Sequence, residues 1–122
     1  MRIARLYDER DASGEWMFAP DHPRVPDPAE RAHIARFLQG GKVILRVTGS
    51  AMDRVEPANG PVVPMSTLTD GTWIWGAALQ YYVETHGIAP EADFLAHIVA
   101  HEYVAPKPDE PAWRAALDQL RQ

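Results

Sequence analysis

The feature that most constrains this fold is the heptapeptide Thr-Asp-Gly-Thr-Trp-Ile-Trp at residues 69–75. Its Asp70-Gly71 step predicts a hairpin turn, because both residue types tolerate a positive φ angle. Apolar residues precede the turn at 62–68 and follow it, so two antiparallel strands are expected there. Helical spacing of apolar residues begins directly afterwards, at 77–86. A hairpin that leads straight into a helix predicts an α+β fold.

Three further helices are predicted from capping signals and apolar spacing. The first, at 28–39, has Asp27 as its cap, and Glu30 is expected to complete a capping box. The Gly40-Gly41 pair is expected to end this helix in a left-handed conformation. The other two helices are predicted at about 91–101 and over the last dozen residues.

Other strands complete the expected sheet. Residues 2–7 and 15–18 flank a polar turn and are expected to form a hairpin. Residues 42–48 form a short β-branched run, which we place near the sheet centre. Pro64 predicts an edge or a bulge for its strand. The expected architecture is one domain over residues 1–122, with a small antiparallel sheet of hairpins packed against about four helices.

The composition excludes several kinds of chemistry. The 122 residues contain no cysteine, which rules out disulfides, thiolate zinc sites and thiol nucleophiles. No cofactor is expected. No apolar run approaches the roughly 20 residues that a membrane span needs, and Asp8 and Glu9 follow too early for a signal peptide. We therefore expect a cytoplasmic protein that does not enter membranes.

The charge distribution favours a protein partner over a nucleic acid. The formal net charge is −5, and residues 49–122 carry four basic residues against ten acidic ones. Nucleic-acid affinity comes mostly from lysine and arginine contacts with phosphates, so an acidic half argues against that class. The same charge either attracts a basic protein or only aids solubility.

The aromatic residues allow two interpretations. They fill the core of a small domain, or they line a pocket or partner site. Asp70 either shapes only its turn, or its carboxylate pairs with Arg46 or Arg54 or meets a ligand. Within the cluster of Trp73, Trp75, Tyr81 and Tyr82, Tyr81 is the member expected to be exposed, because it lies away from the apolar face of its helix. The pocket candidates are Arg46, Arg54, Asp70, Trp73, Trp75 and Tyr82.

A row of Asp93, His97 and His101 is the weak candidate for a metal site. The spacing places the three residues along one side of a helix, and paired histidines four residues apart can hold zinc. The glutamate of the zinc-peptidase motif is missing after His97, since the next acidic residue is Glu102. We expect an exposed row away from the apolar stripe and no bound metal. His86, by contrast, is expected to be partly buried and hydrogen-bonded.

The chain also resembles a family of small, mostly uncharacterised proteins of high-GC bacteria that share a Thr-Asp-Gly-x-Trp-x-Trp hairpin. Some members of that family look like accessory proteins or immunity partners of secreted toxins. The resemblance therefore implies a binding role and supplies no catalytic residue. It is carried by residues 53–57, 62–65, 69–75, 81–91 and 95–98.

The function expected from the sequence is non-catalytic binding of another protein, in the manner of an immunity-type inhibitor of a basic toxin. The sequence is compatible with either a monomer or a homodimer. The alternative is a small-molecule-binding protein or small enzyme that uses the aromatic pocket. The surface expected to meet the partner consists of Tyr81, Glu84, Glu91, Asp93 and Glu102.

Overall fold

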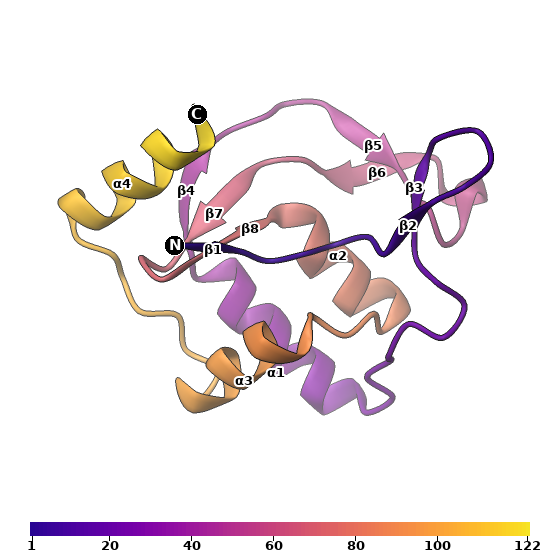
Figure 1. The fold of residues 1–122 in the computed structure, drawn as a ribbon. Coiled ribbons are helices and arrows are strands. Elements are labelled where there is room, and N and C mark those ends of the chain that lie inside the picture. Colours follow the sequence, from indigo (N-terminus) through magenta and orange to yellow (C-terminus); the bar gives the residue numbers. More distant parts are fainter.

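The computed structural model describes all 122 residues and has the predicted α+β class (Figure 1). The helices are α1 (Pro28–Gln39), α2 (Ala77–His86), α3 (Ala92–Ala100) and α4 (Glu110–Leu120), with one 3-10 turn, η1 (Pro57–Asn59). The strands are β1 (Arg2–Ile3), β2 (Glu9–Arg10), β3 (Trp16–Met17), β4 (Lys42–Leu45), β5 (Ser50–Met52), β6 (Pro61–Pro64), β7 (Thr67–Thr69) and β8 (Trp73–Gly76). None of the helices combines the length and apolar character that a membrane crossing requires.

The main sheet has the strand order β1-β8-β7-β4. The predicted hairpin is confirmed, since β7 and β8 are antiparallel and Gly71 in their turn has a φ of 93°. The all-antiparallel prediction is wrong, because β1 pairs with β8 in parallel through Arg2 with Trp73 and Ile3 with Ile74. The central position predicted for the 42–48 strand is also wrong: β4 lies at the edge and pairs only with β7.

Two small two-stranded sheets stand apart from the main sheet. In one, β2 pairs with β3 around the polar turn, so the first strand of that hairpin is Glu9–Arg10 and not 2–7. The stretch from 2 to 7 instead gives its first two residues to the main sheet. In the other, β5 pairs with β6, and Pro64 lies at the end of β6 as an edge residue. The predicted strand 62–68 is therefore divided between two sheets.

The helix starts agree with their capping signals, whereas one helix end does not. Asp27 accepts a hydrogen bond from the Ala29 amide at the start of α1, as expected. The predicted capping box does not form. Both Glu30 carboxylate oxygens instead accept a hydrogen bond from the Tyr103 hydroxyl. Gly40 has a right-handed φ of −77°, so it is not the left-handed stop. Gly87 does end α2 in the left-handed conformation, with a φ of 68°.

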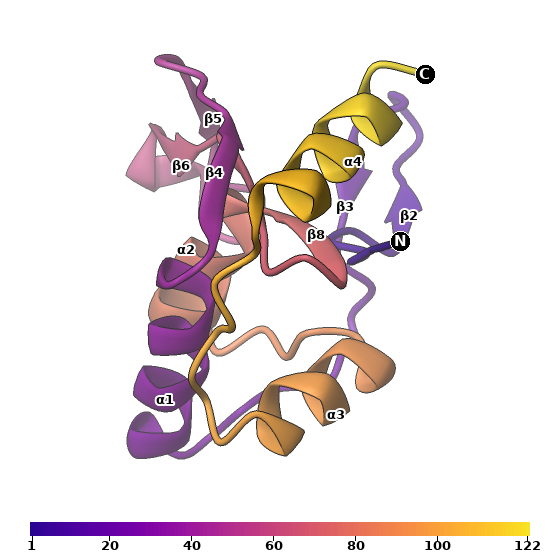
Figure 2. The ribbon, with the colours of Figure 1, turned by 90° about the vertical axis from the view of Figure 1, so that its left-hand side faces the viewer.

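The core lies between the sheet and the helices. Helices α1 and α3 lie on one side of the main sheet and α4 on the other (Figure 2). The first side holds a cluster of twelve buried apolar residues, among them Phe37 of α1, Trp75 of β8 and Phe94 of α3. Gly41 allows this packing, because a Cβ atom there would clash with the ring of Trp75.

Candidate functional site

The predicted pocket around Trp73 and Trp75 is filled with side chains. Both rings are buried, and no cavity of the structure is lined by either. The Trp75 ring lies 5.7 Å from the Phe37 ring and 5.4 Å from the Phe94 ring, centroid to centroid, and its Nε1 donates to the Leu38 carbonyl. The structure therefore supports the interpretation that these aromatic residues fill the hydrophobic core.

Asp70 shapes its turn and pairs with a histidine rather than an arginine. Its Oδ1 accepts the amides of Thr72 and Trp73 at 2.9 and 2.8 Å, and its Oδ2 contacts Nε2 of His97. Neither Arg46 nor Arg54 reaches it: Arg54 pairs with Glu15, and Arg46 is exposed after β4. Asp70 therefore joins the β7–β8 turn to α3.

The predicted histidine row does not form a separate exposed face. The His97 ring packs beside Phe94 and binds Asp70, while Asp93 points to an ion pair with Arg2 at 2.9 Å. His101 contacts the His97 carbonyl through Nδ1. No group of three or more histidine, aspartate or glutamate side chains is placed to hold a metal ion.

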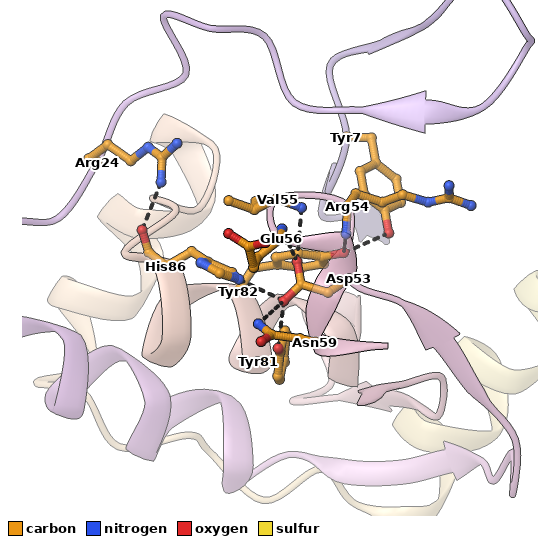
Figure 3. A network of polar contacts seen from close by, with 10 residues as sticks. All are labelled: Tyr7, Arg24, Asp53, Arg54, Val55, Glu56, Asn59, Tyr81, Tyr82 and His86. Carbon is orange, nitrogen blue, oxygen red and sulfur yellow. Dashed lines mark hydrogen bonds and ion pairs between the residues drawn. The ribbon is translucent and has the colours of Figure 1, made fainter. Parts of the chain in front are cut away.

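Asp53, which was not among the candidate site residues predicted from the sequence, is the centre of a polar network (Figure 3). The residue is fully buried after β5. Its Oδ1 accepts the amides of Val55 and Glu56, the two residues just before η1. Its Oδ2 accepts hydrogen bonds from the Tyr81 hydroxyl at 2.6 Å, the His86 ring at 2.7 Å and Asn59 at 3.1 Å.

The network fixes the ionisation of its members. Burial alone would raise the pKa of Asp53, but hydrogen bonds from His86, Tyr81, the Glu56 amide and Asn59 together hold its pKa well below the usual range. The hydrogen bond to the Asp53 carboxylate raises the pKa of Tyr81. Because the carboxylate can only accept, His86 carries a proton on Nε2. The partly buried, hydrogen-bonded His86 is confirmed.

A third aspartate–histidine pair holds the proline-rich connector. The buried His22 ring contacts Asp8 through Nδ1 at 2.7 Å and the Ala89 carbonyl through Nε2 at 2.9 Å. Both partners are acceptors, so the ring makes both hydrogen bonds only when each nitrogen is protonated. Burial raises the pKa of Asp8, but hydrogen bonds from the Ala19 amide and from His22 outweigh it and lower this pKa.

The residues predicted to meet a partner are divided by the fold. Tyr81 is half-buried, with its hydroxyl committed to Asp53. Glu91 accepts the backbone amide of Arg5, and Asp93 pairs with Arg2, so both hold the N-terminal strand. Glu84 and Glu102 are exposed, and neither forms an ion pair.

An apolar groove of about 330 Å³, which we call the open groove, lies where β8 passes into α2. Small residues line it at this junction, and the chain after β1, strand β3 and the β6–β7 link supply larger ones. Of the predicted pocket residues only Arg54 reaches it, and the Arg54 amide donates to the Tyr82 hydroxyl behind it. Its lining residues are Leu6, Tyr7, Glu15, Trp16, Ala51, Arg54, Val63, Pro64, Met65, Ser66, Gly76 and Ala78.

No signal of spacing or composition marked this groove, because its walls come from three separate parts of the chain, at 6–16, 51–66 and 76–78. The one available hint was Trp16, a large aromatic in a short hairpin outside the main sheet. No protein-family model matches the chain, and no curated protein or solved structure is similar enough to count as a match.

Proposed function

We propose that this chain is a non-catalytic protein-binding protein and that the open groove is its contact site. The observation that carries the proposal is that two of its large exposed apolar side chains line this one groove. Trp16 is 46% exposed and Met65 is 48% exposed. Exposed apolar side chains gathered at a concave site are typical of interaction surfaces, where tryptophan is a favoured anchor.

The three aspartate–histidine pairs support a structural use of the titratable residues. Asp8–His22, Asp53–His86 and Asp70–His97 each join elements that are distant in the sequence. Buried polar groups that hydrogen-bond in this way fix the arrangement of a small domain. We therefore place the function at the groove and not at the histidines.

A more specific version of this proposal is that the chain is a cytoplasmic, immunity-type inhibitor. It rests on the resemblance of residues 69–75 and their neighbours to accessory and immunity-like proteins. Glu84 and Glu102 are the acidic side chains of the expected partner surface that stay free of ion pairs, so they could meet a basic partner. Charge reversal at these two positions should slow association with such a partner, and unchanged kinetics would remove them from the contact surface.

Binding of a small apolar molecule is the second candidate. The groove volume of about 330 Å³ lies at the lower end of the range for ligand pockets. The pocket proposed for such a ligand thus moves from Trp73 and Trp75 to the groove beside Arg54. A thermal shift with apolar metabolites that is lost in Trp16→Ala would favour this candidate.

The test of the main proposal is affinity capture from the native host with three baits. The first bait is the wild-type chain, and the second carries Trp16→Ala and Met65→Ser in the groove. The third carries Val99→Ser, which changes a side chain 47% exposed on α3, away from the groove. One stoichiometric protein recovered by the first and third baits but not by the second is expected. Equal recovery by all three baits would contradict a groove contact.

A further inference from the structure

We propose that the chain has a second binding site, which takes the phosphate group of a small organic phosphate. The site is a hollow of about 330 Å³ where the chain leaves α1 for β4, and we call it the lysine hollow. It shares no lining residue with the open groove, so this inference goes beyond the proposed function and does not rest on it. Its lining residues are Gly40, Gly41, Lys42, Lys107, Pro108 and Trp113.

The walls of the lysine hollow come from parts of the chain that pack closely together. The link from α3 to α4 passes beside the junction of α1 with β4 (Figure 2). A Cβ atom at Gly40 would lie 3.3 Å from the Cβ of Ala105, and one at Gly71 would lie 3.2 Å from the Cβ of Pro108. The link is therefore packed against the end of α1 and against the β7–β8 turn, which holds the backbone of Lys107 at the hollow.

Both lysines of the chain line this one hollow. The chain has ten arginines but only two lysines, at positions 42 and 107, and its formal net charge is −5. Arginine presents a planar fork of donors, whereas the lysine ammonium is a compact charge with three donors. Such a charge suits the tetrahedral oxygens of a phosphate group. The fold thus brings the two exceptions to the use of arginine to the same place.

The cations of the hollow have no anionic partner in the chain. Neither lysine forms an ion pair. Lys42 Nζ instead lies 5.5 Å from the centroid of the Trp113 ring, as a cation over an aromatic face. The Gly41 amide, at the same hollow, has no backbone acceptor. Donors are therefore available there for a negatively charged ligand.

The acidic residues that follow in the sequence are committed elsewhere. The Asp109 carboxylate accepts the Ala112 amide as the cap of α4, and Glu110 pairs with Arg114 at 2.7 Å. No acidic side chain lines the hollow. The negative charge that would balance the two ammonium groups must then come from a bound molecule.

The charge and size of the hollow indicate a small phosphomonoester. A phosphomonoester carries a charge of about −1.5 to −2 near neutral pH, which matches two ammonium groups. A volume of about 330 Å³ lies at the lower end of the range for ligand pockets, so it suits a phosphate with one ring-sized group. The half-buried Trp113 provides an apolar wall for that group.

The test titrates the complete wild-type chain at low salt with phenyl phosphate, phenyl sulfate and inorganic phosphate. Amide and indole resonances of the protein are followed, with sodium chloride at equal ionic strength as the blank. Phenyl phosphate should shift the Gly41 and Lys42 amides and the Trp113 indole saturably. Phenyl sulfate, which has the same shape but a single charge, should bind about tenfold more weakly. Inorganic phosphate should also bind more weakly, because it makes no apolar contact with Trp113.

Protein variants supply the matched charge control. Lys42→Gln and Lys107→Gln should each weaken phenyl phosphate binding about tenfold, since each removes one charge-assisted hydrogen bond. Arg46→Gln removes an exposed charge just after β4, outside the hollow, and should weaken binding less than about twofold.

Three results would overturn the inference. The first is that phenyl phosphate causes no saturable shift, and the second is that all three variants bind it equally. Lower melting temperatures of the lysine variants with unchanged binding would show that the lysines only stabilise the C-terminal end of α1. The third is equal affinity for phenyl phosphate and for either of the other two anions, which would exclude an organic phosphate as the ligand.

Discussion

The two ends of strand β8 differ in how they are covered. At one end Trp73 and Trp75 are enclosed beneath the sheet by side chains of α1 and α3, and Trp75 is only 1% exposed. At the other end, Gly76 leads into α2, and the space beside it stays open as a groove with Trp16 at its wall. The aromatic rings of β8 are buried by helices, whereas the ring of Trp16 in the outlying hairpin is left nearly half exposed.

The two ends also differ in what stabilises them. The closed end depends on apolar packing around Phe37, Trp75 and Phe94. The segment after β5, near the groove, depends on the Asp53 network, in which one buried carboxylate accepts five hydrogen bonds. Stability at the closed end should therefore respond to volume changes, and stability near the groove to changes of charge.

The largest expected effect is the loss of Trp75. Trp75→Ala should lower the free energy of unfolding by about 3–5 kcal/mol, because it removes a fully buried ring and leaves a cavity. Denaturant unfolding followed by circular dichroism measures this change. A loss below 1 kcal/mol would show that the closed end is not the main source of stability.

Removal of the Asp53 carboxylate should have the next largest effect. Asp53→Ala leaves the donors of Tyr81, His86 and Asn59 without their acceptor, and we expect a loss of about 3 kcal/mol. The control is Asp93→Ala, whose carboxylate is 67% exposed and which should change stability by no more than about 0.5 kcal/mol. Equal losses in the two variants would refute a special role for the buried network.

Low pH should lower the free energy of unfolding, because it protonates the Asp53 carboxylate near the groove. The pKa values of Asp53 and Asp8 are lowered in the folded chain, so the unfolded chain binds more protons as the pH falls. The free energy of unfolding should be level above about pH 5 and should decline as the pH falls below about 4, the ordinary pKa of an aspartate. Denaturant unfolding at a series of pH values should show a shallower decline for Asp53→Asn than for the wild type. Parallel curves would contradict the assignment.

A smaller loss is expected where the chain passes close to Trp75. Gly41→Ala places a methyl group against the ring and should cost about 1–3 kcal/mol through overpacking. Gly49→Ala is the matched control, because its new Cβ has no atom within 4 Å. A comparison of the two melting curves tests how tightly the closed end is packed.

Local signals made much of the closed end predictable. Asp27 at the start of α1, the Asp70-Gly71 turn and Gly87 at the end of α2 act through neighbours in the sequence, so each could be identified from residue type and spacing. The edge position of β4 was not predictable in this way. An apolar run can be buried by a helix on one face as well as by a second neighbouring strand.

The features near the groove depend on contacts between distant residues. The parallel pairing of β1 with β8 joins residues about 70 positions apart, and periodicity carries no information about it. Asp53 has the signature of a turn residue and does accept the amides of Val55 and Glu56 in its own turn, but Tyr81 and His86 reach it from α2. The groove is likewise lined by segments that lie far apart in the sequence, at 6–16, 51–66 and 76–78.

The smallest stability effect should come from Trp16, and its size separates a docking residue from a core residue. Trp16→Phe should change the free energy of unfolding by no more than about 0.5 kcal/mol, because its side chain is nearly half exposed and packs on few neighbours. The fluorescence lost in this variant should be the part of the wild-type signal that iodide quenches most readily, since Trp73 and Trp75 are enclosed and Trp113 is half-buried. If quenching is equal in the variant and the wild type, the Trp16 ring is covered in solution, and the contrast between the two ends of β8 does not hold.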